Sequence, residues 1–234
     1  MTDTENVITA DDKNIAVITH LAGTLFSIFP ALAVWLLKRN DNAYLSEQAR
    51  EALALWPYRG FHIQHVSVLF SRSQSFLYRG DAREAYEAVS AQWPAMVRSL
   101  QTQNQQTRVM LRDVRARAAV QSSSGGERRT LLARARRDLR SLSREGATWT
   151  DAVANRLRGC IAIAEGDHAT ALQAWRAAVP GLDASGLAVQ AAALRRRLGE
   201  TTGGDEGRAL VTGADRVMRE RGVVDVEALT RMYS

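Results

Sequence analysis

Apolar residues along most of this chain recur at intervals of three and four, the spacing that places them on one face of an α-helix. Few runs have the alternation of apolar and polar residues that is typical of a β-strand. The pattern predicts helices over about residues 45–56, 58–79, 81–93, 94–120, 131–142, 149–164, 167–179, 183–198, 205–221 and 225–232. The chain is therefore predicted to be all-α.

One stretch departs from this pattern because almost all of its residues are apolar. Residues 15–39, IAVITHLAGTLFSIFPALAVWLLKR, contain no charge before Lys38 and Arg39. The 23 uncharged residues exceed the roughly 20 that span the hydrocarbon of a bilayer. We expect a membrane-type helix here. Pro30 leaves open whether this helix crosses the bilayer or breaks and dips into one leaflet.

The residues on either side of this stretch predict its orientation and the division of the chain. Residues 1–14 form a polar, acidic tail, which argues against a secretion signal because such a signal begins with basic residues. The basic pair that ends the stretch favours a cytoplasmic side for all that follows. A linker helix and turn over residues 40–57 leads to a helical domain over residues 58–234. We expect the bacterial inner membrane as the location, with the C-terminal domain in the cytoplasm.

The helical domain contains an internal repeat. Two segments carry matching residues at identical offsets, namely Gly80, Asp81, Ala85, Tyr86, Ala88, Val89 and Pro94, and Gly166, Asp167, Ala171, Leu172, Ala174, Trp175 and Pro180. Glycine suits the left-handed end of one helix, and aspartate suits the N-cap of the next. We expect one helical hairpin used twice, with Pro94 opening a further helix. Stacked hairpins of this kind form an α-solenoid.

The hairpins resemble tetratricopeptide repeats, in which a Gly-Asp turn and a downstream proline are common. Over about residues 57–233, PYRGFHIQHVSVLFSRSQSFLYRGDAREAYEAVSAQWPAMVRSL and LRRRLGETTGGDEGRALVTGADRVMRERGVVD resemble the helical C-terminal region of large bacterial serine/threonine protein kinases. The resemblance implies a helical-repeat module but no kinase, because the chain lacks a glycine-rich loop with a following lysine, HRD and DFG. The polar run QTQNQQT at 101–107 departs from the apolar helix face expected there.

Residues 11–53 resemble a different family. The run DDKNIAVITHLAGTLFSIFPALAVWLLKRNDNAYLSEQAREAL is similar to a small bacterial integral-membrane family of unknown function, related to membrane components of chloroplast protein import. The matching features are Thr-His-Leu, the WLLKR exit and the Glu-Gln-Ala-x-Glu-Ala-Leu that follows. That family continues with further membrane helices, whereas this chain turns into the repeat region after Leu55. A genuine fusion of two partial families and a chimeric gene product are both open.

The charge of the chain does not by itself indicate a nucleic-acid-binding protein. The net charge is +6 and the pI is near 10.1, and among 31 basic residues only Lys13 and Lys38 are lysines. The arginines are spread over many helices among Asp and Glu, without a helix-turn-helix or an aromatic RNA-reading motif. Nucleic acid is therefore not expected among the partners. The single cysteine, Cys160, rules out a disulfide within the chain.

The sequence assigns no catalytic, cofactor-binding or metal-binding residue. His62 and His65 are the best metal candidates, being about one helical turn apart, but no further ligand follows at a suitable spacing, so a packed pair is the preferred interpretation. His20 is expected to hydrogen-bond a neighbouring helix rather than to relay protons. Cys160 lies among apolar helix positions and is expected to be an inert, buried thiol.

Three further features each allow a structural and a functional interpretation. The glycines of TTGGDEGR at 201–208 precede a helix, where phosphate could bind, but a helix–helix linker is preferred because no GK[ST] follows. The arginines of 129–144 gather near one face, which we expect to be solvated, or to contact anionic lipid if the domain is tethered. Trp93, Trp149 and Trp175 are expected to pack between hairpins, whereas an exposed tryptophan in a groove would anchor a partner.

These patterns together predict a membrane-associated, non-enzymatic scaffold that binds protein partners through its helical repeats and needs no cofactor. The alternative is a detached regulatory module of a bacterial serine/threonine kinase signalling system. A chimeric gene product without a defined activity and an enzyme with an unrecognised site are further alternatives.

Overall fold

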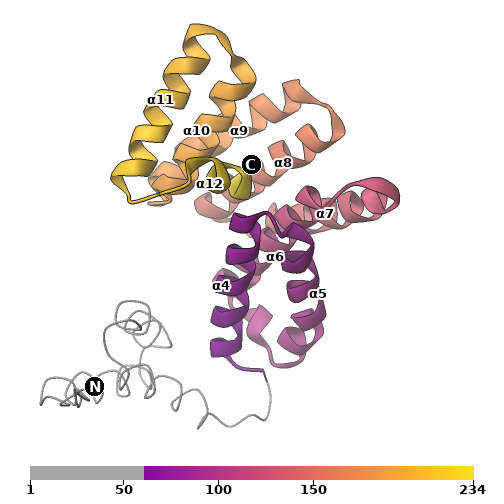
Figure 1. Ribbon diagram of the computed structural model, residues 1–234. Helices are drawn as coiled ribbons and strands as arrows, with labels where there is room; N and C mark the ends of the chain where they lie inside the picture. The colour runs from indigo at the N-terminus through magenta and orange to yellow at the C-terminus, as the bar shows by residue number, and fades with distance from the viewer. Residues whose placement is uncertain (1–60) are drawn as a thin grey trace, which may run out of the picture. The chain divides into compact units, whose positions relative to one another are not determined.

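The computed structural model describes residues 61–234, and over this range the chain is helical and contains no β-strand (Figure 1). The all-α prediction is thus confirmed for these residues. The α-helices are α4 (Ile63–Arg79), α5 (Ala82–Arg98), α6 (Gln105–Gln121), α7 (Arg128–Leu142), α8 (Thr148–Glu165), α9 (His168–Ala184), α10 (Ala188–Thr202), α11 (Gly204–Glu220) and α12 (Val226–Tyr233).

The predicted tail, membrane-type helix and linker helix over residues 1–57 lie outside the described residues. Within residues 61–234, no helix has both the length and the apolar character needed to cross a membrane. The chain divides into two units, Met1–Ser67 and Val68–Ser234. The packing described below is that of the second unit.

Helices that follow one another in sequence pack against one another. This holds for α5 with α6, α6 with α7, α8 with α9, α9 with α10 and α10 with α11, and α6 and α7 also contact α8. Figure 1 shows the pairs α8–α9 and α10–α11 running side by side. The chain therefore forms a series of helical hairpins whose helices are joined by short connections.

Both Gly-Asp turns of the internal repeat join two helices, as predicted. Gly80 follows α4 with a φ of 90°, and Gly166 follows α8 with a φ of 84°, a conformation that glycine adopts without strain. Asp167 caps α9 by accepting a hydrogen bond from the Thr170 N–H at 3.0 Å. Asp81 occupies the equivalent position, but its carboxylate instead accepts a hydrogen bond from the guanidinium of the preceding arginine.

The prediction that a new helix begins at Pro94 is wrong. Pro94 lies inside α5, as Pro180 lies inside α9, and α5 continues to Arg98. A proline inside a helix loses a backbone hydrogen bond and costs about 3 kcal/mol. Val89 and Met96, on either side of Pro94, are both fully buried. We attribute the continuity of the helix to this burial, which outweighs the local preference of proline.

The polar run at 101–107 spans the connection between α5 and α6 and the first residues of α6, so it does not interrupt the apolar face of one long helix, which corrects its interpretation. After α5 the chain turns at Leu100, which has a φ of 60°, and Gln101–Gln103 form a 3-10 turn. Asn104 then caps α6 by accepting a hydrogen bond from the Thr107 N–H at 2.9 Å. The amide side chains of the run thus lie where a helix ends and the next begins.

Two clusters of apolar side chains form the core of the hairpins. One joins α6, α7 and α8, and the other joins α8, α9 and α10 around the fully buried Trp175. Gly159 of α8 faces this indole so closely that a methyl group at its position would overlap the ring. The indole Nε1 donates to the carbonyl oxygen of Arg156 at 3.2 Å. The repeat's tryptophan is therefore part of the core, as predicted, and the contacts of its ring are with α8 of its own hairpin.

Candidate functional site

Helices α6 and α8 carry three charged side chains that are removed from water. The Arg117 side chain is 1 % exposed, that of Arg156 is 0 % exposed, and that of Asp113 is 10 % exposed. Arg117 lies one turn after Asp113 on α6, and its Nε donates to Asp113 Oδ2 at 3.0 Å. From α8, Arg156 Nη2 donates to Asp113 Oδ1 at 2.6 Å. One carboxylate thus joins two guanidinium groups, and we call these three residues the Arg–Asp–Arg triad.

The pKa values of Asp113 and Arg156 are both shifted in the direction that favours the charged form. Burial alone would raise the pKa of the Asp113 carboxyl, but the charges and hydrogen bonds of Arg117 and Arg156 outweigh it and hold that pKa below its usual range. Burial would lower the pKa of Arg156, but Asp113 outweighs it and the pKa is raised. Among the described residues, no second carboxylate pairs with either guanidinium. The triad therefore carries one excess positive charge.

Helix α12 supplies groups that attract this excess positive charge. Arg117 Nη1 donates to the carbonyl oxygen of Met232, in the last turn of α12, where backbone carbonyls lack partners within the helix. The Tyr233 ring lies under both guanidinium groups, with its centroid 4.8 Å from Arg117 Cζ and 5.1 Å from Arg156 Cζ. Both the carbonyl and the face of an aromatic ring attract a cation.

A cavity of about 560 Å³ lies beside Tyr233. Its lining comes from α4, α6, α8, the start of α10 and α12, and we call the surface formed by α4, α6, α8 and α10 the inner surface. The apolar lining residues are Phe70, Val109, Met110, Trp149, Val153 and Leu187. The polar lining includes four glutamines, Gln74, Gln105, Gln106 and Gln190, together with Asp113 and Arg156 of the triad.

Two of the glutamines hold the triad in place. Gln74 Oε1 accepts a hydrogen bond from Arg117 Nη2 at 2.9 Å, and its amide nitrogen donates to the Tyr233 hydroxyl at 3.5 Å. Gln190 accepts a hydrogen bond from Arg156 Nη1. The lining of the cavity therefore combines apolar side chains with polar groups that are held by hydrogen bonds.

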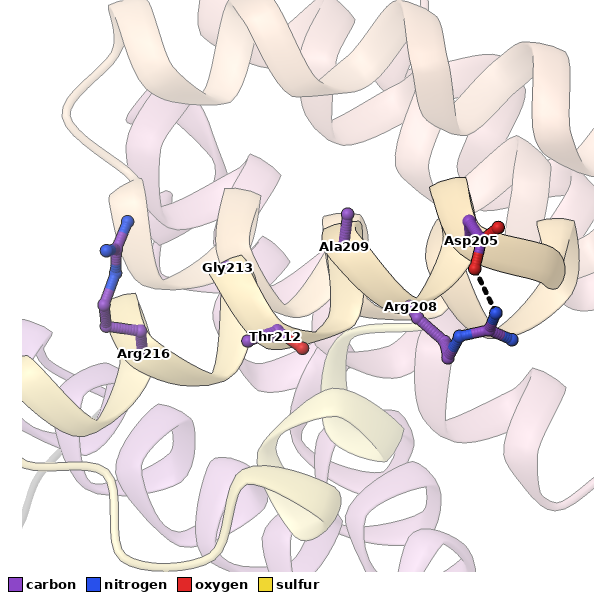
Figure 2. Close-up of a pocket in the computed structure, with 6 residues that line it drawn as sticks. All are labelled: Asp205, Arg208, Ala209, Thr212, Gly213 and Arg216. Carbon is purple, nitrogen blue, oxygen red and sulfur yellow. Dashed lines mark hydrogen bonds and ion pairs between the residues drawn. The ribbon is translucent and has the colours of Figure 1, made fainter.

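A second depression lies on the outer side of α11 and carries no comparable chemistry. Figure 2 shows its lining residues spread along this one helix, with Asp205 and Arg208 pointing toward each other at the start of α11. This ion pair is 98 % and 73 % exposed at its two side chains, and pairs so exposed contribute little free energy. We therefore take the cavity beside Tyr233 as the candidate functional site.

The histidines considered as metal ligands lie in the first unit. The backbone N–H of His62 donates to His65 Nδ1 at 3.0 Å, and the two ring centroids are 5.9 Å apart. Phe61 also lies against the His65 ring, with centroids 5.3 Å apart. Over residues 61–234, no group of three or more His, Cys, Asp or Glu side chains is placed to hold a metal ion. His20 lies outside the described residues.

The buried-thiol interpretation of Cys160 is confirmed, and the thiol also lies against α12. Cys160 Sγ donates to the carbonyl oxygen of Tyr233 at 3.8 Å. Burial raises the pKa of this thiol, so it stays protonated at neutral pH.

The glycines of 201–208 lie at the turn between α10 and α11, which is the place that the linker interpretation expects. Gly199 and Gly207 approach each other so closely that a Cβ on either would overlap the other's backbone. The first turn of α11 carries Asp205 and Glu206, whose negative charges oppose an anion at this helix end. Gly199 and Gly207 thus allow the close packing of α10 and α11, whereas Gly203 and Gly204 supply the positive φ angles of the turn.

The arginines of 129–144 and two of the tryptophans are placed as follows. Arg137 and Arg140 on α7 are exposed, and the similarly exposed Arg136 pairs with Glu165, so this face is solvated as expected. Trp93 is half-buried under the guanidinium of Arg115, 3.9 Å from its ring centroid. Trp149 packs against the core and also lines the cavity.

Sequence reasoning missed the triad and Tyr233. The only local signal was the i, i+4 spacing of Asp113 and Arg117, which equally suits an exposed surface pair. Arg156 lies 43 residues from Asp113, and nothing in its neighbourhood distinguishes it from the exposed arginines.

No family model matches the chain, and comparisons with curated proteins and with solved structures find no significant match. The two resemblances noted from the sequence therefore stay predictions.

Proposed function

We propose that this protein is a non-catalytic scaffold whose hairpins form a tetratricopeptide-like solenoid and bind a segment of a partner protein in the cavity beside Tyr233. Residues 15–39 attach it to the bacterial inner membrane, with the helical domain on the cytoplasmic side. The membrane part of the proposal is supported by the uncharged stretch and the basic pair that follows it.

The observation that carries the proposal is the composition of the cavity. Apolar side chains such as Trp149, Met110 and Leu187 suit the anchoring side chains of a peptide. A glutamine amide both donates and accepts hydrogen bonds, as a peptide backbone does, and four glutamines line the same cavity. The lining combines helices from successive hairpins, as expected of a binding surface built by stacked repeats.

The charged groups beside the cavity suit a structural role better than catalysis. A general acid or base works best when its pKa lies near the working pH. The pKa of Asp113 is lowered and that of Arg156 is raised, so each is moved away from neutrality. These shifts favour a binding module over acid–base chemistry at the triad.

The proposal is tested by selecting peptides from a random display library on the purified full chain. We expect selected peptides to lose at least tenfold in affinity for a chain carrying Gln106→Ala and Met110→Ala, because both side chains line the cavity. The matched control is Gln103→Ala, an exposed glutamine one turn earlier whose side chain does not line the cavity. If no selected peptide responds to the cavity variants, the cavity is not the binding site.

A further inference from the structure

The inner surface already holds one occupant, the helix α12. In Figure 1 this helix lies among α4, α6, α8 and α10, and it bonds to each of them. The contacts are Arg231 Nη2 to the Tyr78 carbonyl, Gln121 Nε2 to the Arg231 carbonyl, Cys160 Sγ to the Tyr233 carbonyl and Arg196 Nη1 to the Glu227 carboxylate. One short helix thus contacts the first helix of every hairpin.

The end of α12 is matched to the triad by charge. Carbonyl oxygens of its last residues accept bonds from Arg117, Gln121 and Cys160. The C-terminal end of a helix carries a partial negative charge, which compensates the excess positive charge of the triad. The Arg156 Nε remains buried without a hydrogen bond to any described residue, so the site still favours acceptor groups. The Tyr233 ring completes the match by lying against both guanidinium groups.

The attachment of α12 is weaker than that of the hairpins. It has eight residues, too few for a helix that is stable by itself in water. Its buried apolar side chains are Ala228, Met232 and Tyr233, whereas α8 contributes to both apolar clusters of the core. The preceding loop contains Val224, which is 95 % exposed. Elements with few buried apolar contacts open locally at a lower cost than global unfolding.

We infer that α12 is an intramolecular ligand of the inner surface, and that its place is the binding site for a partner helix of the same chemistry. The partner is a short amphipathic helix with an aromatic residue in its last turn, whose final carbonyls face Arg117 and whose ring lies against Arg156. This inference rests on the proposed function, since it specifies the partner and its access. A short loop holds α12 at an effective concentration on the order of millimolar, so only a partner that binds well displaces it.

The first test is hydrogen exchange on the full chain. We expect the amides of α12 to exchange at least tenfold faster than those of α8, with little dependence on low concentrations of denaturant, because α12 opens locally. Equal exchange rates and equal denaturant dependence for the two helices would mean that α12 leaves only when the fold unfolds. That result would overturn the inference without any variant having to fold.

The second test uses a labelled peptide with the sequence of residues 224–234, VDVEALTRMYS. We expect it to bind the full-length Tyr233→Ala chain at least tenfold more tightly than the wild-type chain, whose own α12 occupies the site. A peptide that carries Tyr233→Ala should bind this chain at least tenfold more weakly than the unchanged peptide does. A peptide that carries Val224→Ala is the matched control, because that position is exposed, and it should bind as tightly as the unchanged peptide. Equal binding to both chains, or equal binding of all three peptides, contradicts the inference.

The two proposals fail separately. Library peptides can lose affinity for the chain with Gln106→Ala and Met110→Ala even if α12 never leaves its place. That result supports the proposed function and contradicts the inference about α12. The opposite result is that the peptide of residues 224–234 binds as expected, but no library peptide loses affinity in the cavity variants. In that case the surface covered by α12 is the binding site and the cavity is not.

Discussion

Gly159 of α8 lies directly against the indole of Trp175 on α9, and its substitution tests the packing around that ring. Gly159→Ala places a methyl group inside the space of the buried indole, so we expect the free energy of unfolding to fall by about 1–3 kcal/mol. Gly213→Ala is the matched control, because a methyl group there meets open space in the helix α11. That variant should gain up to about 1 kcal/mol. Urea denaturation of both variants measures the difference.

Leu100 is the one described non-glycine residue with a positive φ, 60°, and its side chain is largely exposed. A left-handed conformation costs a side-chain-bearing residue roughly 1–2 kcal/mol, which glycine avoids. Leu100→Gly should therefore raise the free energy of unfolding by about 0.5–1 kcal/mol after the added chain entropy is counted. Leu100→Ala keeps the Cβ and serves as the control. Equal stability of the two variants in thermal unfolding would show that no strain is relieved.

At the scale of elements, Asp113 connects α6 to α8 because it bonds to a guanidinium on each helix. Asp113→Asn leaves two buried positive charges without a counter-charge, and we expect the free energy of unfolding at pH 7 to fall by about 3–5 kcal/mol. Asp205→Asn removes a carboxylate that is 98 % exposed and should change stability little. Chemical denaturation of the two variants gives the comparison.

The same carboxylate also predicts how stability depends on pH. Its pKa in the folded chain is lowered below the usual value of about 3.9. The stabilisation is therefore complete above about pH 4 and is lost as the pH falls further, through the folded pKa. The wild type should lose stability more steeply below pH 4 than Asp113→Asn does. If the free energy of unfolding falls with pH at the same rate in both proteins, Asp113 is not the group that titrates.

The elements also show how far the sequence could predict the structure. The Gly80-Asp81 turn was predictable because adjacent residues determine it through backbone conformation and capping. The helix start at Pro94 was predicted wrongly because burial of Val89 and Met96 outweighs a local preference. The triad could not be predicted, since it joins residues on two helices that a single sequence does not place together. Tyr233 was missed for the same reason.

At the scale of the whole molecule, the sequence predicts a membrane attachment that the helical domain alone should not have. We expect the full chain to sediment with membranes and to require detergent for extraction, because residues 15–39 carry no charge before Lys38. A chain starting at residue 58 should stay in the supernatant. Ultracentrifugation of lysates containing either chain measures this. Recovery of the full chain in the supernatant without detergent contradicts the attachment.

The position of α12 among the hairpins has a consequence for the order of folding. The hairpins form between neighbours in sequence, whereas bonds of α12 join residues as far apart as Gln74 and Tyr233, a separation of 159 residues. Contacts between distant residues form slowly, and a chain folds from its N-terminus as it leaves the ribosome. We therefore expect docking of α12 to be the last step of folding. Until α12 docks, the guanidinium groups of Arg117 and Arg156 are not covered by it. A partner that is present during synthesis can therefore bind there without displacing α12.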